Sequence, residues 1–198
     1  MLQILFVLGV ALLLAYFSQN GTFSVNISNK TKIDVPLIAL ICLLGFFSGL
    51  RTNYNDTYLY IKLFKSADTL QNYLDTNPGI FENPLFYGFR NFFRNEISDN
   101  HHLYLVIFGF FTNGSMIRFI KKYSSNFVLS VLIYFSVGLF YDTMGALKQT
   151  VAIAVLTYAI DALLKKKYLL YYIIVLIAVL CHSYAIFFII LPIFTNRP

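Results

Sequence analysis

The chain has 198 residues, of which 58% are hydrophobic and 12% are charged, and its formal net charge is +6. A soluble domain of this length could not hide several apolar runs of bilayer length from water, so the composition indicates an integral membrane protein whose solvent is the lipid bilayer. The positive charge comes from short clusters beside apolar runs and forms no extended basic patch, which argues against nucleic acid as a partner.

Six apolar runs are candidates for crossing a hydrocarbon core of about 30 Å, although the second and fourth are short. They lie at about 1–17, 35–50, 103–122, 127–141, 146–164 and 168–194. The sequence therefore predicts an all-α integral membrane protein with about six transmembrane helices in one polytopic domain, residues 1–198. The sixth run would be about 40 Å long as a single helix, so it should either tilt strongly or break within "CHSYA", residues 181–185.

Clusters of lysine and arginine predict the orientation of these spans. The clusters are Lys30 and Lys32, then Arg118 with Lys121 and Lys122, and then Lys165, Lys166 and Lys167. Six spans place all three clusters on one side, and the positive-inside rule makes that side cytoplasmic. The N-terminus and an outer segment between the second and third spans, about 51–102, are then predicted to face the extracytoplasmic side.

The outer segment is predicted to be helical and amphipathic. Asp56 can cap a helix that runs to about Tyr73, and a second helix can begin with Asn83 as its cap and Pro84 at its first position. Aromatic residues recur in this second helix at near-helical spacing. That pattern favours a helix lying at the outer membrane interface and, equally, a helix whose aromatic side packs on the bundle.

Three ionisable residues are predicted near one level of the outer leaflet. Arg51 closes the second span, Lys148 opens the fifth, and His182 lies about 21 Å above the inner surface when counted from Tyr168. Each has a plain structural reading, as an interfacial anchor or as a histidine satisfied by a neighbouring backbone. Their common level nevertheless favours a shared cavity, since ionisable groups at such depth usually face one. Arg118, in contrast, is predicted to snorkel to the inner surface.

Signals of soluble enzymes and of cofactor sites are missing from the sequence. It has no phosphate-binding glycine loop, no H-E-x-x-H pair and no serine nucleophile elbow. Cys42 and Cys181 lie inside apolar runs without metal-ligand spacing. His101 and His102 are adjacent, an arrangement that rarely binds one metal well. We therefore expect neither a metal nor a cofactor.

Four segments occur in the order seen in a known family. They are "GLRTNYNDTYLYIKLF" at 49–64, "FENPLFYGF" at 81–89, "MGALKQTVAIAV" at 144–155 and "IAVLCHSYAIFFIILP" at 177–192. Through them the chain resembles the N-terminal part of the EpsG-like, Wzy-type polysaccharide polymerases. Positions that match the family pattern are Arg51, Asp56, Glu82, Gln149 and His182. The chain departs from it at Lys148, where the family usually has arginine, and at Asn55, where it has glycine.

The resemblance implies a glycosyltransferase that polymerises undecaprenyl-pyrophosphate-linked oligosaccharide repeats into capsular or exopolysaccharide. The reaction takes place at the outer face of the bacterial cytoplasmic membrane, and other capsule or exopolysaccharide assembly proteins are candidate partners. The polymerisation reaction requires cations for the pyrophosphate leaving group and a general base for the acceptor hydroxyl. The expected pyrophosphate contacts are Arg51, Lys148 and Gln149, and the candidate bases are Asp56 and His182, followed by Glu82.

Two other functions remain open from the sequence. One is a transporter or channel in which Lys148 and His182 line a solute or proton path, although the chain shows no internal repeat of the kind common in transporters. The other is a non-catalytic partner in glycan export. Because the resembled polymerases have more spans, the chain is expected to be a truncated N-terminal fragment that lacks spans needed to complete the cavity and is inactive by itself.

Overall fold

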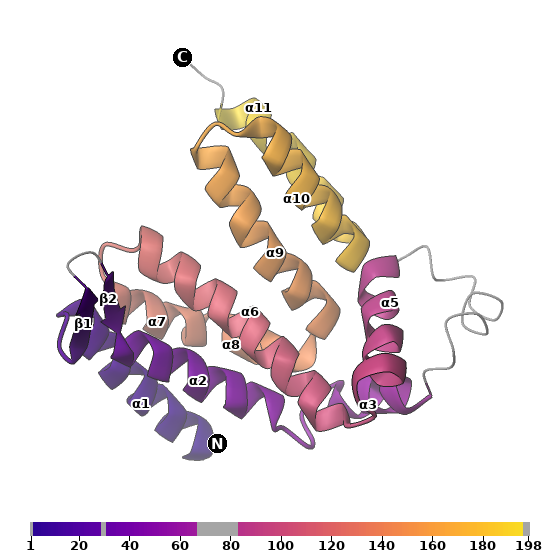
Figure 1. Cartoon of the computed structure of the whole chain (residues 1–198), viewed down its shortest axis with the longest axis horizontal. Coiled ribbons are helices and arrows are strands. Elements are labelled where there is room, and N and C mark those ends of the chain that lie inside the picture. Colours follow the sequence, from indigo (N-terminus) through magenta and orange to yellow (C-terminus); the bar gives the residue numbers. More distant parts are fainter. Residues whose placement is uncertain (1, 29–30, 67–82, 196–198) are drawn as a thin grey trace.

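The computed structural model describes residues 2–28, 31–66 and 83–195. Helices make up nearly all of this part of the chain (Figure 1), which confirms the predicted all-α fold class. In chain order the elements are α1 (Leu2–Gln19), β1 (Ser24–Ser28), β2 (Thr31–Asp34), α2 (Val35–Gly49), α3 (Thr57–Lys65), α5 (Pro84–Phe92), the π-helix η2 (Phe93–Ile97), α6 (His101–Tyr123), α7 (Phe127–Ser136), α8 (Leu139–Gly145), α9 (Leu147–Leu164), α10 (Tyr168–Cys181), the 3₁₀-helix η3 (Ser183–Ile190) and α11 (Leu191–Thr195).

A small antiparallel hairpin, β1–β2, connects α1 to α2 and is not among the predicted elements. Ser24 pairs with Asp34, and Val25 pairs with Ile33. Apolar and polar residues alternate from Phe23 onward, which is the period-two pattern of a strand. The pattern covers only a few residues, so it is a weak signal beside the long apolar runs that flank it.

The helices form two groups that share α6. In the first group, α1, α2, α6 and α7 surround a cluster of buried side chains that includes Leu40, Leu44 and Ile117. In the second, α9 and α10 lie side by side and enclose, with α3, α5 and the first half of α6, a cluster that includes Phe64 and Tyr104. Helix α6 therefore connects the two halves of the molecule (Figure 1).

Fewer helices than predicted are long enough to span a bilayer. Helices α1, α6 and α9 meet the length and hydropathy of a span, and a fourth span results if α7 and α8 are one bent unit. Helices α2 and α10 have 15 and 14 residues, or about 22 and 21 Å, which falls short of a core of about 30 Å. The described residues thus support a multi-pass membrane protein with three or four clear spans, and the count of six is not supported.

The predicted span at 127–141 is bent. Helix α7 ends at Ser136, α8 begins at Leu139, and their axes differ by 49°. Gly138, with φ of +88°, stands between them in a left-handed conformation that side chains disfavour. The bend carries the chain toward the start of α9.

The sixth predicted span breaks at the expected place but reverses direction there. His182 is extended, with φ −156° and ψ 121°, between α10 and η3. Near the start of α10, the Tyr171 hydroxyl donates a hydrogen bond to the carbonyl of Phe188, so η3 runs back beside α10. A continuous helix would separate these two residues by about 26 Å. Residues 168–194 therefore form a hairpin with His182 at its tip, and the prediction of one crossing is corrected.

The tightest helix contact, between α2 and α6, depends on glycines. A Cβ atom built on Gly49 would lie 2.4 Å from the Cα of Val106, and one on Gly109 would lie 2.5 Å from the carbonyl oxygen of Gly45. Gly45 and Gly49 are four residues apart, the small-residue spacing that lets membrane helices approach closely. No larger residue fits at these positions without moving the backbone.

Buried polar side chains reinforce this contact. The Asn113 side chain on α6 donates to Ser48 Oγ on α2 at 3.0 Å, and the Tyr134 hydroxyl on α7 donates to Asn113 Oδ1 at 3.0 Å. All three residues are buried. Because each of these bonds satisfies polar atoms away from water, the network holds the three helices in one register.

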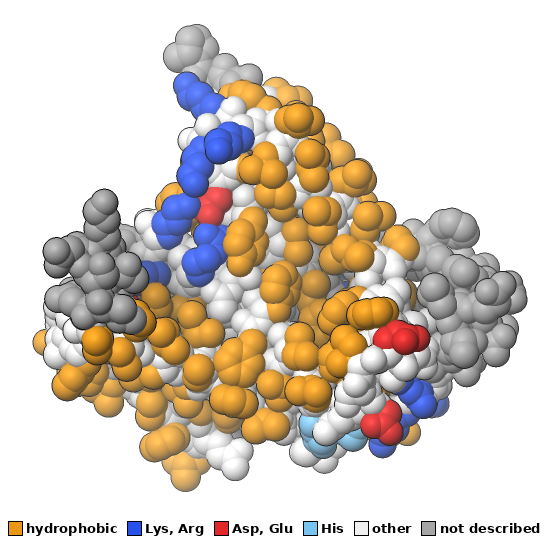
Figure 2. Space-filling view, viewed as in Figure 1, with side chains coloured by type: hydrophobic (Ala, Val, Ile, Leu, Met, Phe, Trp, Pro, Cys, Tyr) orange, Lys and Arg blue, Asp and Glu red, His pale blue; other side chains and the backbone are white. Residues whose placement is uncertain are grey.

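Ion pairs lie near the C-terminal ends of α6 and α9. Arg118 and Lys122 on α6 contact Asp161 on α9 at 2.6 and 2.9 Å, and Lys121 lies 3.6 Å from Asp34 at the start of α2. Arg118 therefore pairs across two helices, and its position at the inner membrane surface stays a prediction. Figure 2 shows Lys and Arg side chains gathered where the ends of α6 and α9 face each other. These contacts bring parts of the basic regions to one end of the bundle.

The α2–α6 contact leads to a stability prediction. Replacing Gly109 with alanine should lower the free energy of unfolding by about 1–3 kcal/mol, because the new methyl group meets the backbone of Gly45. The matched control is Gly9→Ala on α1, where a new Cβ meets no atom within 4 Å. Thermal unfolding of the detergent-purified protein measures both variants. Equal midpoints for the two would contradict the close-packing account.

Candidate functional site

The outer segment packs against the bundle through its aromatic side chains. Phe86 of α5 and Phe64 of α3 are buried, with ring centroids 5.6 Å from Phe108 and 4.8 Å from Tyr104 respectively. Arg94 donates to the carbonyl of Phe64 at 2.9 Å, which joins η2 to the end of α3. The aromatic side of α5 therefore packs on the bundle, which is one of the two predicted alternatives. A position of this helix at the membrane interface stays a prediction.

Arg51 is held at the end of α2 with one nitrogen unsatisfied. Its Nε donates to Thr57 Oγ1 at 2.9 Å, and its Nη1 donates to the carbonyl of Ser48. Nη2 is buried and has no hydrogen-bond partner among the described residues. Burial lowers the pKa of Arg51 to about 10, which still leaves the guanidinium protonated at neutral pH. The result is a buried, charged donor with spare capacity.

Lys148 lies in the first turn of α9 and contacts an aromatic side chain. Its Nζ donates to the Tyr87 hydroxyl at 3.1 Å and lies 5.2 Å from the centroid of the same ring. The guanidinium carbon of Arg90, a buried residue, lies 5.1 Å from that centroid. Two cations therefore share one tyrosine ring through cation–π contacts. Neither Tyr87 nor Arg90 is among the site residues predicted from the sequence.

His182 is oriented by Asn83. Its Nδ1 lies 3.3 Å from Asn83 Oδ1, and the backbone nitrogen of Ser183 donates to the same oxygen at 3.2 Å. Because an amide oxygen only accepts, a hydrogen bond at this position requires the proton on Nδ1. Nε2 then carries the lone pair, and it is buried without a partner among the described residues. Asn83 does begin α5 as predicted, but its side chain makes no capping bond to that helix.

Tyr60 connects these residues into one assembly. Its hydroxyl interacts electrostatically with Arg51 and Tyr87 and with the backbone of Lys148, and Lys148 in turn interacts with His182. We call Arg51, Tyr60, Tyr87, Lys148 and His182 the polar cluster. The common level of Arg51, Lys148 and His182 in the outer leaflet stays a prediction. The outer segment supplies both tyrosines, which no residue spacing in the spans could indicate.

The remaining candidate residues have different positions. Asp56 precedes α3 as predicted, yet its exposed side chain makes no capping bond and interacts electrostatically with Tyr60. Gln149 is exposed. Among the described residues, no hydrogen bond joins its side chain to the polar cluster. Glu82 lies outside the described residues. In the described part of the chain, no group of three His, Cys, Asp or Glu side chains could hold a metal ion.

The turn before Asp56 explains one departure from the resembled pattern. Asn55 has φ of +44°, a left-handed conformation that glycine adopts freely and that asparagine tolerates better than most residues. Its side chain also packs on Gly145, where an added Cβ would lie 2.7 Å from Asn55 Nδ2. Asparagine thus keeps the turn and fixes it against the junction of α8 and α9, three residues before Lys148.

Comparison with known proteins identifies the family. The profile of the EpsG family matches residues 34–198, which include α2, the outer segment and every residue of the polar cluster. No curated protein and no solved structure matches the chain. Because the family match covers well over half of its length and the apolar helices are those of a membrane protein, the chain belongs to the EpsG family of membrane proteins related to polysaccharide synthesis.

Proposed function

We propose that the protein is a polymerase of lipid-pyrophosphate-linked oligosaccharide repeats, which it joins into capsular or exopolysaccharide at the outer face of the bacterial cytoplasmic membrane. Membership of the EpsG family supports a role in polysaccharide synthesis. The observation that carries the finer proposal is the polar cluster, in which cations and a histidine with a free ring nitrogen come together.

The reaction defines what the polar cluster must do. The acceptor hydroxyl of one repeat attacks the anomeric carbon of the donor glycan, and the bond from that carbon to the pyrophosphate oxygen breaks. The pyrophosphate leaves with the electron pair, and a base takes the hydroxyl proton. Cations are needed where negative charge develops on the leaving group, and the base must be unprotonated before the reaction.

Arg51 and Lys148 fit the leaving-group role because their partners are neutral. Arg51 donates to a carbonyl and to the Thr57 hydroxyl, and Lys148 donates to the Tyr87 hydroxyl. All the ion pairs seen within the described residues are at the other end of the helices, at Asp161 and Asp34. Within the described residues, the charges of Arg51 and Lys148 are therefore uncompensated and suit an anionic ligand.

His182 fits the role of the base, with Asp56 as the second candidate. Nε2 of His182 carries the lone pair and is buried in a residue that interacts electrostatically with Lys148, whereas the Asp56 carboxylate is exposed. Burial first, and then the electrostatic interaction with Lys148, favours the neutral imidazole, which is the form that can accept a proton. Asn83 acts here as a positioning residue, since it holds Nδ1–H.

The leaving-group role predicts the effect of neutralising Lys148. Lys148→Gln in the full-length protein should lose about 2–4 kcal/mol of transition-state stabilisation, or about 30- to 1,000-fold in rate, and Arg51→Gln should also be impaired. Lys148→Arg should recover most of the rate, because it keeps the charge. Polymer formed from lipid-linked repeats is the readout, normalised to membrane-inserted protein.

A matched control separates this effect from a general loss of surface charge. Lys165→Gln removes the same charge at the other end of α9, where the side chain is exposed, and should leave polymerisation unchanged. Normal polymer from both Lys148→Gln and Arg51→Gln would rule out the pyrophosphate role of these residues.

The base role predicts a pH effect at Asn83. His182→Gln should reduce the rate by about 10²- to 10⁴-fold, as expected for the loss of a general base. Asn83→Asp keeps the accepting oxygen but adds a negative charge, which stabilises the imidazolium and raises the pKa of His182. Because activity needs the neutral imidazole, the acidic limb of the pH–rate profile should move to higher pH. A profile that stays in place for Asn83→Asp, together with inactive Asp56→Asn, would assign the base to Asp56 instead.

The proposed orientation predicts which positions are reachable from outside the cell. In a protein without Cys42 and Cys181, a cysteine introduced at Asp99 should react with a membrane-impermeant thiol reagent in intact cells. A cysteine at Lys166, exposed at the opposite end, should react only after the cells are opened. Labelling of position 166 in intact cells would invert the topology and place the polar cluster on the cytoplasmic side.

A further inference from the structure

We infer that an apolar pocket beneath the polar cluster binds the first part of the polyprenyl chain of the lipid-linked donor. This inference rests on the proposed function, because it assigns the hydrocarbon part of the ligand whose pyrophosphate is expected at Arg51 and Lys148. It adds a binding site for an isoprenoid chain between α5, α6, α9 and α10.

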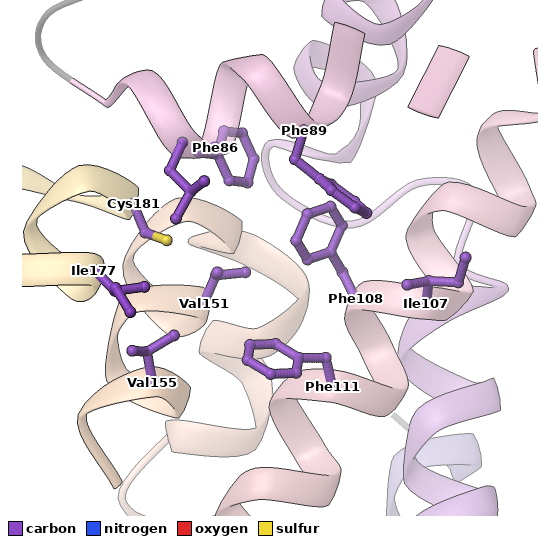
Figure 3. Close-up of a pocket in the computed structure, with 10 residues that line it drawn as sticks. Phe86, Phe89, Ile107, Phe108, Phe111, Val151, Val155, Ile177 and Cys181 are labelled. Carbon is purple, nitrogen blue, oxygen red and sulfur yellow. The ribbon is translucent and has the colours of Figure 1, made fainter. Parts of the chain in front are cut away.

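The pocket has a buried floor and an exposed rim. Its volume is about 360 Å³, and its lining is entirely hydrophobic. Figure 3 shows Phe86, Phe108, Val151 and Cys181 directed toward one common space; all four are buried. The rim is formed by exposed residues that include Ile177, which is 39% exposed. Since the rim lies on membrane helices, a lipid chain can enter from the bilayer side.

The pocket continues directly from the polar cluster. On α9, Val151 and Val155 lie three and seven residues beyond Lys148, or about 4.5 and 10.5 Å along the helix axis. This spacing places all three on one side of the helix. On the neighbouring helix, Cys181 of the pocket precedes His182. Each helix thus changes from a charged or titratable residue to the hydrophobic lining within one turn, as an amphiphilic ligand requires.

Charge and shape favour the donor lipid over an ordinary membrane phospholipid. Arg51 and Lys148 are two cations without an acidic partner among the described residues. Such a concentration of positive charge suits a pyrophosphate better than a single phosphodiester. The pyrophosphate is covalently joined to the first carbon of its chain, so that carbon must lie near Lys148, where the pocket begins.

Filling the deep end of the pocket tests the inference. We would replace Val155 with tryptophan in the full-length protein and measure kcat/KM with two donors that carry the same oligosaccharide pyrophosphate. One donor has a long polyprenyl chain, and the other has a prenyl chain too short to reach Val155. Val155→Trp should lower kcat/KM for the long-chain donor about tenfold or more, mainly through KM, and that factor equals about 1.4 kcal/mol. The short-chain donor should be used almost as well as by the unmodified protein.

Two further variants make the result specific. Ile177→Trp, on the opposite wall, should show the same preference for the short-chain donor. Ile153→Trp, an equally large change on the lipid-exposed face of α9 that does not line the pocket, should affect neither donor.

The outcomes separate the inference from the function on which it rests. If Val155→Trp leaves both donors unaffected, the pocket holds another occupant, such as a bilayer lipid, and the inference is wrong. Equal losses with both donors would show a general disturbance of the site, and that result also overturns it. If the unmodified protein elongates neither donor while remaining folded in the membrane, the proposed polymerase function itself fails.

Discussion

The close approach of α2 to α6 at Gly45, Gly49 and Gly109 is the constraint on which the remaining structure depends. Lipid offers no hydrophobic drive for helices to associate, so close backbone contact and buried hydrogen bonds must hold them together. The approach places Ser48 of α2 within hydrogen-bond reach of Asn113 of α6. A wider separation would break this bond between buried polar side chains, which is costly away from water.

The cations at the two ends of the bundle have different kinds of partner. At one end, Asp161 accepts contacts from Arg118 and Lys122, and such pairs join helices and neutralise the charge. At the other end, Arg51 and Lys148 have carbonyl, hydroxyl and aromatic partners among the described residues. Neutral partners orient a cation without cancelling its charge. The first arrangement suits structural stability, and the second suits the binding of an anion.

The hairpin at His182 is held by Asn83 of the outer segment. The 14 residues of α10 bring His182 to Lys148, which lies at the start of α9. The chain reverses direction after His182, and this reversal exposes the backbone of Ser183. Asn83 satisfies both the imidazole and this backbone group. An unsatisfied backbone donor in a bilayer is costly, so the break in the helix and its partner from the outer segment are needed together.

The sequence by itself determined the membrane class and the main helices, because apolar run length and periodicity depend only on local residue order. Asn83 and Pro84 likewise marked the start of α5. What only the tertiary structure decided was the direction of the chain after His182, the bend at Gly138 and the partners of each charge. Tyr60, Tyr87 and Asn83 contact residues that lie far from them along the chain. Such contacts arise from how the helices pack, and no periodicity within a single segment encodes them.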